Sequence, residues 1–113
     1  FDKIIKDAVA KGIKQKNIII DPGISFGKSG NNNIEILKNI EYFVKKFERV
    51  CLGVSNKRFS SKLFKDIKDD DLKILSLTIS AYATFKNVEF LRVHDVDVNQ
   101  DAIDVAWKTI NSL

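Results

Sequence analysis

The sequence is poor in the features that mark secreted and membrane proteins. Its 113 residues include one cysteine, Cys51, which cannot form an internal disulfide bond and therefore agrees with a reducing compartment. The longest apolar runs are too short to span a bilayer, and the N-terminus shows no signal-peptide pattern. We therefore expect a cytoplasmic protein that binds no membrane. Cys51 lies within an apolar run, so we expect it to be a small buried side chain rather than a nucleophile.

The charge of the chain does not favour binding to nucleic acid. The net charge of +4 is modest, and the lysines are spread along the chain, often beside acids. Because the chain has no dense block of Lys and Arg with interleaved aromatics, we expect no nucleic-acid partner. The composition, 44% hydrophobic and 30% charged, is typical of a globular protein, and the length allows one modest domain over residues 1–113. The chain begins with Phe1 rather than methionine, as expected of a processed chain or a fragment.

Helical and strand patterns alternate along the chain. Apolar residues at helical spacing alternate with β-branched runs that are typical of strands buried on both faces. Residues 72–86 fit either pattern, but their length and their position between two strands favour a helix. The expected N-caps are Asp2, Asn33 and Asn99. The expected helices cover residues 2–14, 34–47, 72–86 and 99–113, and the expected strands cover residues 17–21, 49–54 and 88–93.

This order predicts an α/β protein whose strands are parallel and joined by right-handed crossovers. Ligands bind such sheets at the carboxyl ends of the strands. The expected strands end at Asp21, at residues 53–58 and at Arg92 with His94, so ionisable side chains gather at one edge of the sheet. The connection over residues 22–33 is rich in Gly, Ser and Asn and long enough to be functional.

Each of these residues also has a plain structural explanation. An Asp before Pro-Gly, as at Asp21, is a common turn former, while His94 can satisfy a backbone carbonyl and Lys57 can be a solvated surface charge. The Gly-rich connection could cradle a phosphate, but its spacing is not that of a P-loop. The joint occurrence of these groups at one edge favours a ligand with a donor-rich ring at one end and phosphates at the other.

The chemistry of four side chains fits such a ligand. Asp21 can accept two N–H bonds from an amidine-like edge, and Lys57 can donate to a ring carbonyl or ring nitrogen. Arg92 offers a flat face for stacking and a fork for phosphate oxygens, and His94 can donate to a departing phosphate. The sequence shows no Ser–His–Asp set and no metal-ligand cluster with strong spacing.

Three motifs resemble those of the dihydropteroate synthases. The chain carries Asp-Pro-Gly-Ile-Ser-Phe-Gly-Lys at 21–28, Gly-Val-Ser-Asn-Lys at 53–57 and Arg-Val-His-Asp-Val at 92–96, in the order and spacing of that family. The resemblance implies a (β/α)8 TIM barrel of which this chain supplies the C-terminal portion, strands six to eight. It also implies a transferase of folate biosynthesis, which joins a dihydropterin pyrophosphate to p-aminobenzoate and releases dihydropteroate and pyrophosphate.

The resemblance also implies how the ligand is held. Asp21 would bind the amino group and ring nitrogens of the pterin, and Lys57 would contact the pterin from the other side. Arg92 would flank the ring and bind phosphate together with His94. In the family the pyrophosphate leaves first, and the aniline nitrogen then attacks the resulting pterin cation.

The second substrate, the cofactor and the assembly follow from the same resemblance. Ser55 and Phe26 would lie near p-aminobenzoate, Mg²⁺ would assist the leaving group through ligands outside this chain, and the parent enzyme would be a homodimer. Two positions depart from the family motifs: Ser25 replaces a glycine, and Asn56 replaces the arginine of Ser-Arg-Lys. Ser is disfavoured at residue 25 if φ is positive there, so this loop would shift. Asn56 removes a charge that in the family helps to hold its loop or the p-aminobenzoate, although Arg58 lies two residues on, so the departures bear mainly on the p-aminobenzoate contacts.

Other interpretations remain open from the sequence. A pterin-binding methyltransferase that serves corrinoid proteins would share the barrel and the pterin pocket. A non-catalytic fragment that needs a partner chain, or an α/β domain unrelated to pterins, would also fit the pattern. Because three strands cannot close a barrel, which typically takes about 250 residues, we expect the chain alone to be inactive as a synthase.

Overall fold

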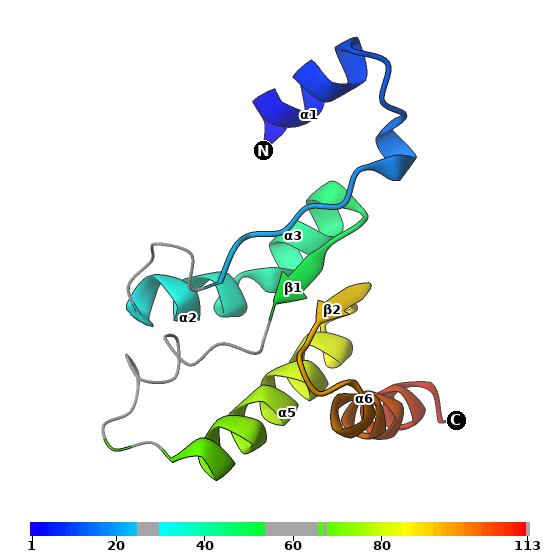
Figure 1. Ribbon diagram of the computed structural model, residues 1–113. Helices are drawn as coiled ribbons and strands as arrows, with labels where there is room; N and C mark the ends of the chain where they lie inside the picture. The colour runs from blue at the N-terminus through cyan, green and yellow to red at the C-terminus, as the bar shows by residue number, and fades with distance from the viewer. Residues whose placement is uncertain (25–29, 54–65, 67, 113) are drawn as a thin grey trace.

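The computed structural model describes residues 1–24, 30–53, 66 and 68–112 of the protein. Helices and short strands follow one another along the chain (Figure 1). In chain order the elements are α1 (Asp2–Ala10), the 3-10 helix η1 (Gln15–Asn17), α2 (Gly30–Lys38), α3 (Ile40–Phe47), β1 (Cys51–Gly53), α5 (Asp69–Phe85), β2 (Phe90–Arg92) and α6 (Val96–Asn111).

The two strands are parallel, as the alternating pattern predicts. β1 pairs with β2 in a register that places Cys51 opposite Phe90 and Gly53 opposite Arg92. Both strands are shorter than expected, but each lies within its predicted range. The prediction of an α/β protein with parallel strands is confirmed.

The first expected strand is reduced to a single bridge. Residues 17–21 are predicted as a strand, but Asn17 belongs to η1, and only Ile20 pairs, in parallel, with Val50. Two backbone hydrogen bonds of 2.9 and 2.8 Å connect Ile20 to the residues on either side of Val50. Within the described part of the chain no strand lies on the other side of Ile20, so this segment has a ladder along one edge only.

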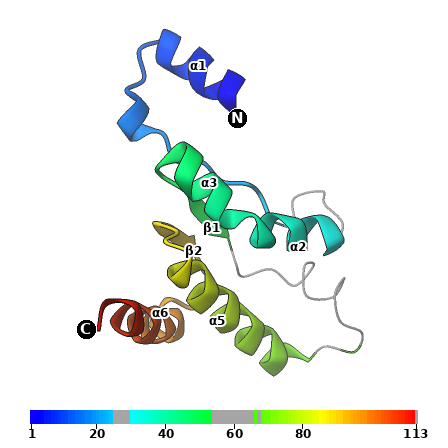
Figure 2. The same ribbon diagram turned by 180° about the vertical axis from the view of Figure 1, so that it is seen from behind.

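The helices cover one face of the strands. β1 and β2 lie in front of α3 and α5 in Figure 1, and the same helices lie in front when the molecule is seen from behind in Figure 2. Val50 and Leu52 face this side, are almost fully buried and form a core with Ile40 and Ala83. Burial of the Val50 and Leu52 side chains stabilises the fold by roughly 1.5–3 kcal/mol each. Because side chains alternate along a strand, Cys51 faces the opposite side of the sheet.

The first helix is shorter than expected. The pattern predicts a helix over residues 2–14, but α1 ends before Gly12, whose φ of 95° breaks the helix. The predicted N-cap at Asp2 is wrong, because Phe1 holds the N-cap position and Asp2 lies in the first turn. There the Asp2 carboxylate pairs with Lys46 Nζ of α3 at 2.8 Å.

The second expected helix begins earlier than predicted and is divided in two. α2 begins at Gly30, so Asn33 lies inside the helix, where it is buried, and its predicted role as N-cap is wrong. Asn39 separates α2 from α3. Its Nδ2 donates to the backbone oxygen of Glu35 at 2.8 Å, a local bond of the kind that competes with regular helix.

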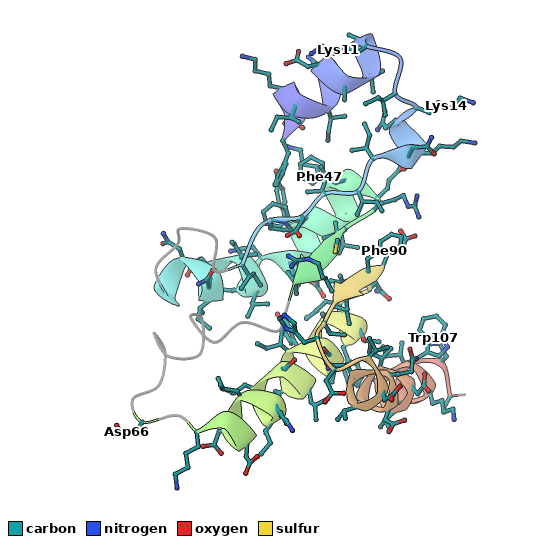
Figure 3. The ribbon with its side chains drawn as sticks, in the orientation of Figure 1. Lys11, Lys14, Phe47, Asp66, Phe90 and Trp107 are labelled. Atoms are coloured by element: carbon teal, nitrogen blue, oxygen red, sulfur yellow. The ribbon has the colours of Figure 1, made fainter. Side chains whose placement is uncertain are left out.

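The ambiguous segment at residues 72–86 is helical, as its length and position predict. It lies within α5, which begins three residues earlier than the expected helix. α5 packs against α6, and Figure 3 shows the Trp107 side chain on the outer side of α6. No helix in the described ranges is long and apolar enough to cross a membrane.

The contact between α5 and α6 corrects the last predicted N-cap. α6 begins at Val96 with Asp95 at the N-cap position, so Asn99 does not cap the helix. Instead Asn99 is 2% exposed, its Nδ2 donates to the backbone oxygen of Asp95 at 2.7 Å, and its Oδ1 accepts a hydrogen bond from Ser80 Oγ of α5 at 2.6 Å. A buried polar pair therefore holds the two helices together.

Candidate functional site

One face of the sheet is left uncovered by α3 and α5, and polar side chains at the carboxyl ends of the strand segments lie on it. We call this the open face; it carries Asp21, Cys51, Gly53, Phe90 and Arg92. Arg92 at the end of β2 places its Nη2 atom 3.3 Å from Oδ2 of Asp21, which follows the Ile20 bridge. The structure thus brings together two residues that the sequence places at one edge of the sheet.

Exposure of this ion pair leaves it accessible to a ligand. The Arg92 side chain is 56% exposed and the Asp21 side chain 34% exposed. A pair so open to water stabilises the fold by at most about 1 kcal/mol. Its arrangement therefore has more consequence for binding than for stability.

Asp21 is oriented by a tight turn. The backbone N–H of Gly23 donates to Asp21 Oδ1 at 2.8 Å, and Gly23 adopts a φ of 73° that favours glycine. Asp21 is therefore a turn former, as its Pro-Gly neighbours predict. Each carboxylate oxygen already accepts from one protein donor, but each has a second lone pair with which to accept an N–H from a ligand.

Gly53 lies beneath the Arg92 guanidinium. A Cβ atom built on Gly53 would lie 2.5 Å from Arg92 Nη2 and 2.9 Å from Arg92 Cζ, well inside van der Waals contact. The guanidinium therefore occupies the space that a side chain on Gly53 would take. Gly53 is not among the residues that the sequence singles out for ligand contact, although its alternation with buried Leu52 places it on the open face.

Cys51 lies on the same face of β1 as Gly53 and is half-buried, less than its apolar neighbours predict. Burial raises the pKa of the Cys51 thiol, the Asp21 carboxylate raises this pKa further, and Arg92 opposes both effects. The thiol is therefore held in its protonated form, which agrees with the expectation that Cys51 is not a nucleophile. Its pKa responds to both members of the ion pair.

His94 stands between the end of β2 and the start of α6. Its side chain is exposed, and Asp95 holds the N-cap position of α6 directly after it. The first turn of a helix presents backbone N–H groups that favour an anion, although the carboxylate of Asp97 in this turn opposes one.

Three predicted ligand contacts lie outside the described residues. These are Lys57 for the pterin and Ser55 and Phe26 for p-aminobenzoate, together with the motif departures at Ser25 and Asn56. Their roles stay predictions.

The opposite, amino ends of the strand segments are held together by Arg49. Arg49 Nη2 pairs with Glu89 Oε1 at 2.9 Å, and Nη1 donates to the backbone oxygen of Lys16 at 2.9 Å. The guanidinium also lies 5.0 Å from the centre of the Phe90 ring, which is labelled in Figure 3. One side chain therefore contacts all three segments at the end away from Asp21.

A hollow of about 320 Å³ lies where α1, η1 and α3 meet, and neither Asp21 nor Arg92 lines it. Its lining consists of Asp2, Ile5, Lys6, Gln15, Ile18, Ile20, Lys46 and Phe47. Within residues 1–24, 30–53, 66 and 68–112 no group of three or more His, Cys, Asp or Glu side chains lies close enough together to hold a metal ion.

Comparison with known sequences gives one family. The family described as pterin binding enzyme matches residues 1–94. The chain is 36% identical over 99 residues to the dihydropteroate synthase of Streptococcus pyogenes serotype M6, covering 87% of this chain and 37% of that protein. It is 36% identical over 112 residues to the folate synthesis bifunctional protein of Chlamydia caviae, covering 97% of this chain and 25% of that protein. The chain thus spans less than two fifths of the length of these curated relatives.

Solved structures give the same result. The dihydropteroate synthase of Yersinia pestis superposes with a TM-score of 0.90 at 26% identity, covering 99% of this chain and 46% of that one. That of Anaplasma phagocytophilum, with bound 6-hydroxymethylpterin-monophosphate, superposes with a TM-score of 0.84 at 30% identity, covering 93% of this chain and 41% of that one.

Proposed function

The chain belongs to the family of pterin binding enzymes, and from this premise we propose that it supplies part of the active site of a dihydropteroate synthase. The reaction would break the C–O bond between the pterin methylene carbon and pyrophosphate and form a C–N bond to p-aminobenzoate, whose amino group loses a proton. The relatives named above are folate-synthesis proteins, which favours the synthase over a corrinoid methyltransferase.

The chain would form strands six to eight of a (β/α)8 barrel. In such a barrel the helices lie outside and the ligand binds at the carboxyl ends of the strands. The covered face with Val50 and Leu52 would then be the outer face, and the open face would look into the barrel. This orientation accounts for apolar residues such as Ile19, 43% exposed, because further strands would cover them.

The Asp21–Arg92 pair is the observation that carries the proposal. Asp21 would accept N–H bonds from the amino group and ring nitrogen of the pterin through the lone pairs that Gly23 and Arg92 leave. Arg92, held beside the carboxylate, would lie against the ring and extend its fork toward phosphate. A guanidinium next to a carboxylate thus matches a ligand that is donor-rich at one end and anionic at the other.

His94 would bind the pyrophosphate. Its position ahead of α6 lets an imidazole donor and the backbone N–H groups of the first turn act on the same anion. Donation to an oxygen that gains charge as the bond breaks would lower the barrier. Lys57 for the pterin, and Ser55 with Phe26 for p-aminobenzoate, complete the proposed site from their family motifs.

Magnesium and assembly stay expectations from the family resemblance, and a cytoplasmic location stays an expectation from the sequence composition. A homodimer would bury apolar side chains on α6, of which Val105 and Trp107 are 68% and 58% exposed. A cytoplasmic location agrees with the single cysteine.

Calorimetry with 6-hydroxymethylpterin monophosphate tests the pterin role of Asp21. We expect Asp21→Asn to weaken binding by roughly 1–3 kcal/mol, because an amide NH2 would replace one acceptor oxygen and face ligand N–H groups. The matched control is Asp7→Asn, which makes the same change at an exposed residue of α1. Equal affinities of Asp21→Asn and Asp7→Asn in the full-length enzyme, with both variants folded, would reject the assigned role.

A further inference from the structure

Arg92 and Asp21 come from segments that are not neighbours in the sheet. β1 lies between the Ile20 segment and β2, because Ile20 bridges to Val50 on one side of β1 and β2 pairs on the other. Strands lie about 4.8 Å apart, so the two outer segments are separated by roughly 9–10 Å. The Arg92 side chain therefore has to cross β1 to reach Asp21.

The crossing point is Gly53. Gly53 is the register partner of Arg92, and both face the open side of the sheet. The guanidinium lies so close to the Gly53 backbone that a Cβ atom there would approach Nη2 to 2.5 Å and Cζ to 2.9 Å. Real Cβ atoms essentially never come this near another heavy atom, so any side chain at residue 53 would displace the guanidinium.

The backbone of Gly53 does not itself demand glycine. Among the glycines described, Gly12 and Gly23 have positive φ, and Gly53 is not among them. Gly53 lies within β1, where glycine weakens a strand and typically marks close approach of another group. The close approach here is that of Arg92.

We propose that Gly53 is a positioning residue, whose missing side chain opens the path along which Arg92 crosses β1 to pair with Asp21. The consequence for pterin binding rests on the proposed function, but the crossing itself does not. Replacing Gly53 with Ala would leave both Asp21 and Arg92 in the sequence and still separate them.

The single cysteine provides a reporter that needs no pterin. Cys51 lies one step along the open face from Gly53, and it is the only thiol in the chain. Asp21 raises the pKa of the Cys51 thiol, while Arg92 lowers it. If the guanidinium moves away, the thiol loses its nearby cation and becomes harder to ionise, so alkylation at a fixed pH slows.

The experiment measures the pH dependence of iodoacetamide alkylation of Cys51 in the full 113-residue chain. We expect Gly53→Ala and Arg92→Gln each to shift the rate profile to higher pH and to slow alkylation roughly two- to fourfold below its midpoint, as for a partly exposed charge pair. Asp21→Asn should shift the profile in the opposite direction. Circular dichroism of each variant verifies the helices.

The double variant separates positioning from a general effect on the strand. In an Arg92→Gln background, Gly53→Ala should add nothing, because the group that it displaces is already gone. An unchanged profile in Gly53→Ala, or an equal added shift in the Arg92→Gln background, would overturn the proposal.

A second measurement covers the case in which Gly53→Ala does not fold. In the unmodified chain, nuclear Overhauser effects between the Gly53 α-protons and the Arg92 guanidinium protons are expected, and their absence would overturn the proposal. Neither measurement involves pterin, so failure of the proposed synthase function would leave both results standing.

Discussion

Substitution of Ser80 by Ala gives a direct measure of the buried polar contact between α5 and α6. Ser80 is 0% exposed and Asn99 is 2% exposed, and Ser80 Oγ donates to Asn99 Oδ1 at 2.6 Å. Ala would remove the donor and leave the Asn99 oxygen buried with no hydrogen bond from Ser80. Leaving a buried acceptor unsatisfied costs about 1–3 kcal/mol. That is a large share of the roughly 5–15 kcal/mol by which a domain is stable.

Urea unfolding followed by circular dichroism measures this cost. For a small protein we expect the unfolding midpoint of Ser80→Ala to fall by roughly 0.5–2 M. The matched control is Thr78→Ala on the same helix, because Thr78 Oγ1 donates to the Ile74 backbone oxygen on the exposed side. The control should stay within about 0.5 kcal/mol of the unmodified chain.

The pair can also be removed as a unit. Adding Asn99→Leu to Ser80→Ala removes the unsatisfied acceptor. The backbone oxygen of Asp95 then loses the Asn99 side-chain donor, but it still accepts a hydrogen bond from the backbone N–H of residue 99, which lies at 3.2 Å. The double variant should therefore be less destabilised than the sum of the two single variants. The reasoning fails if Ser80→Ala is as stable as Thr78→Ala, or if the two single effects simply add.

Two further predictions concern acid stability and activity. Hydrogen bonds from Lys46 and Lys86 hold the pKa values of Asp2 and Glu41, respectively, below their ordinary values. A carboxyl group whose pKa is lower in the folded state than in the unfolded state adds stability at pH values above its unfolded-state pKa. This stability is lost as the pH falls through the folded-state pKa, so the urea midpoint should drop between about pH 5 and pH 3. An identical drop in an Asp2→Asn, Glu41→Gln double variant would show that these pairs are not the cause. We also expect no synthase turnover from the 113-residue chain with pterin pyrophosphate and p-aminobenzoate, because three strand segments cannot close a barrel; steady-state product formation would contradict this.

The sequence predicts the order of elements better than their ends. The helix at residues 72–86 could be inferred because its length and its place between strands decided between two periodicities. The predicted N-caps at Asn33 and Asn99 are wrong. Asn33 lies inside α2, and Asn99 is buried against Ser80 of α5, a partner that no local pattern reveals. Local chemistry states which side chains can cap a helix, whereas tertiary packing decides whether they do.

The candidate site is also predictable from the sequence only in part. That Asp21 and Arg92 lie at one edge of the sheet follows from parallel strands alone. That Arg92 crosses β1 over Gly53 depends on side-chain geometry, which the strand pattern does not contain. The alternation of Gly53 with buried Leu52 is the one signal in the sequence that would have placed it on the ligand side.

The contacts of Arg49 have a consequence for how this site can change over evolutionary time. Arg49 joins Glu89, Lys16 and Phe90 at the amino ends of the strand segments, far from the residues that would touch a ligand. The Arg49 contacts do not depend on Asp21 or Arg92, and the stability of the segments comes mainly from the buried side chains on the covered face, because exposed ion pairs add little. Selection by an inhibitor or a new substrate can thus change Asp21 or Arg92 at little cost in stability, because the buried core does not include either side chain.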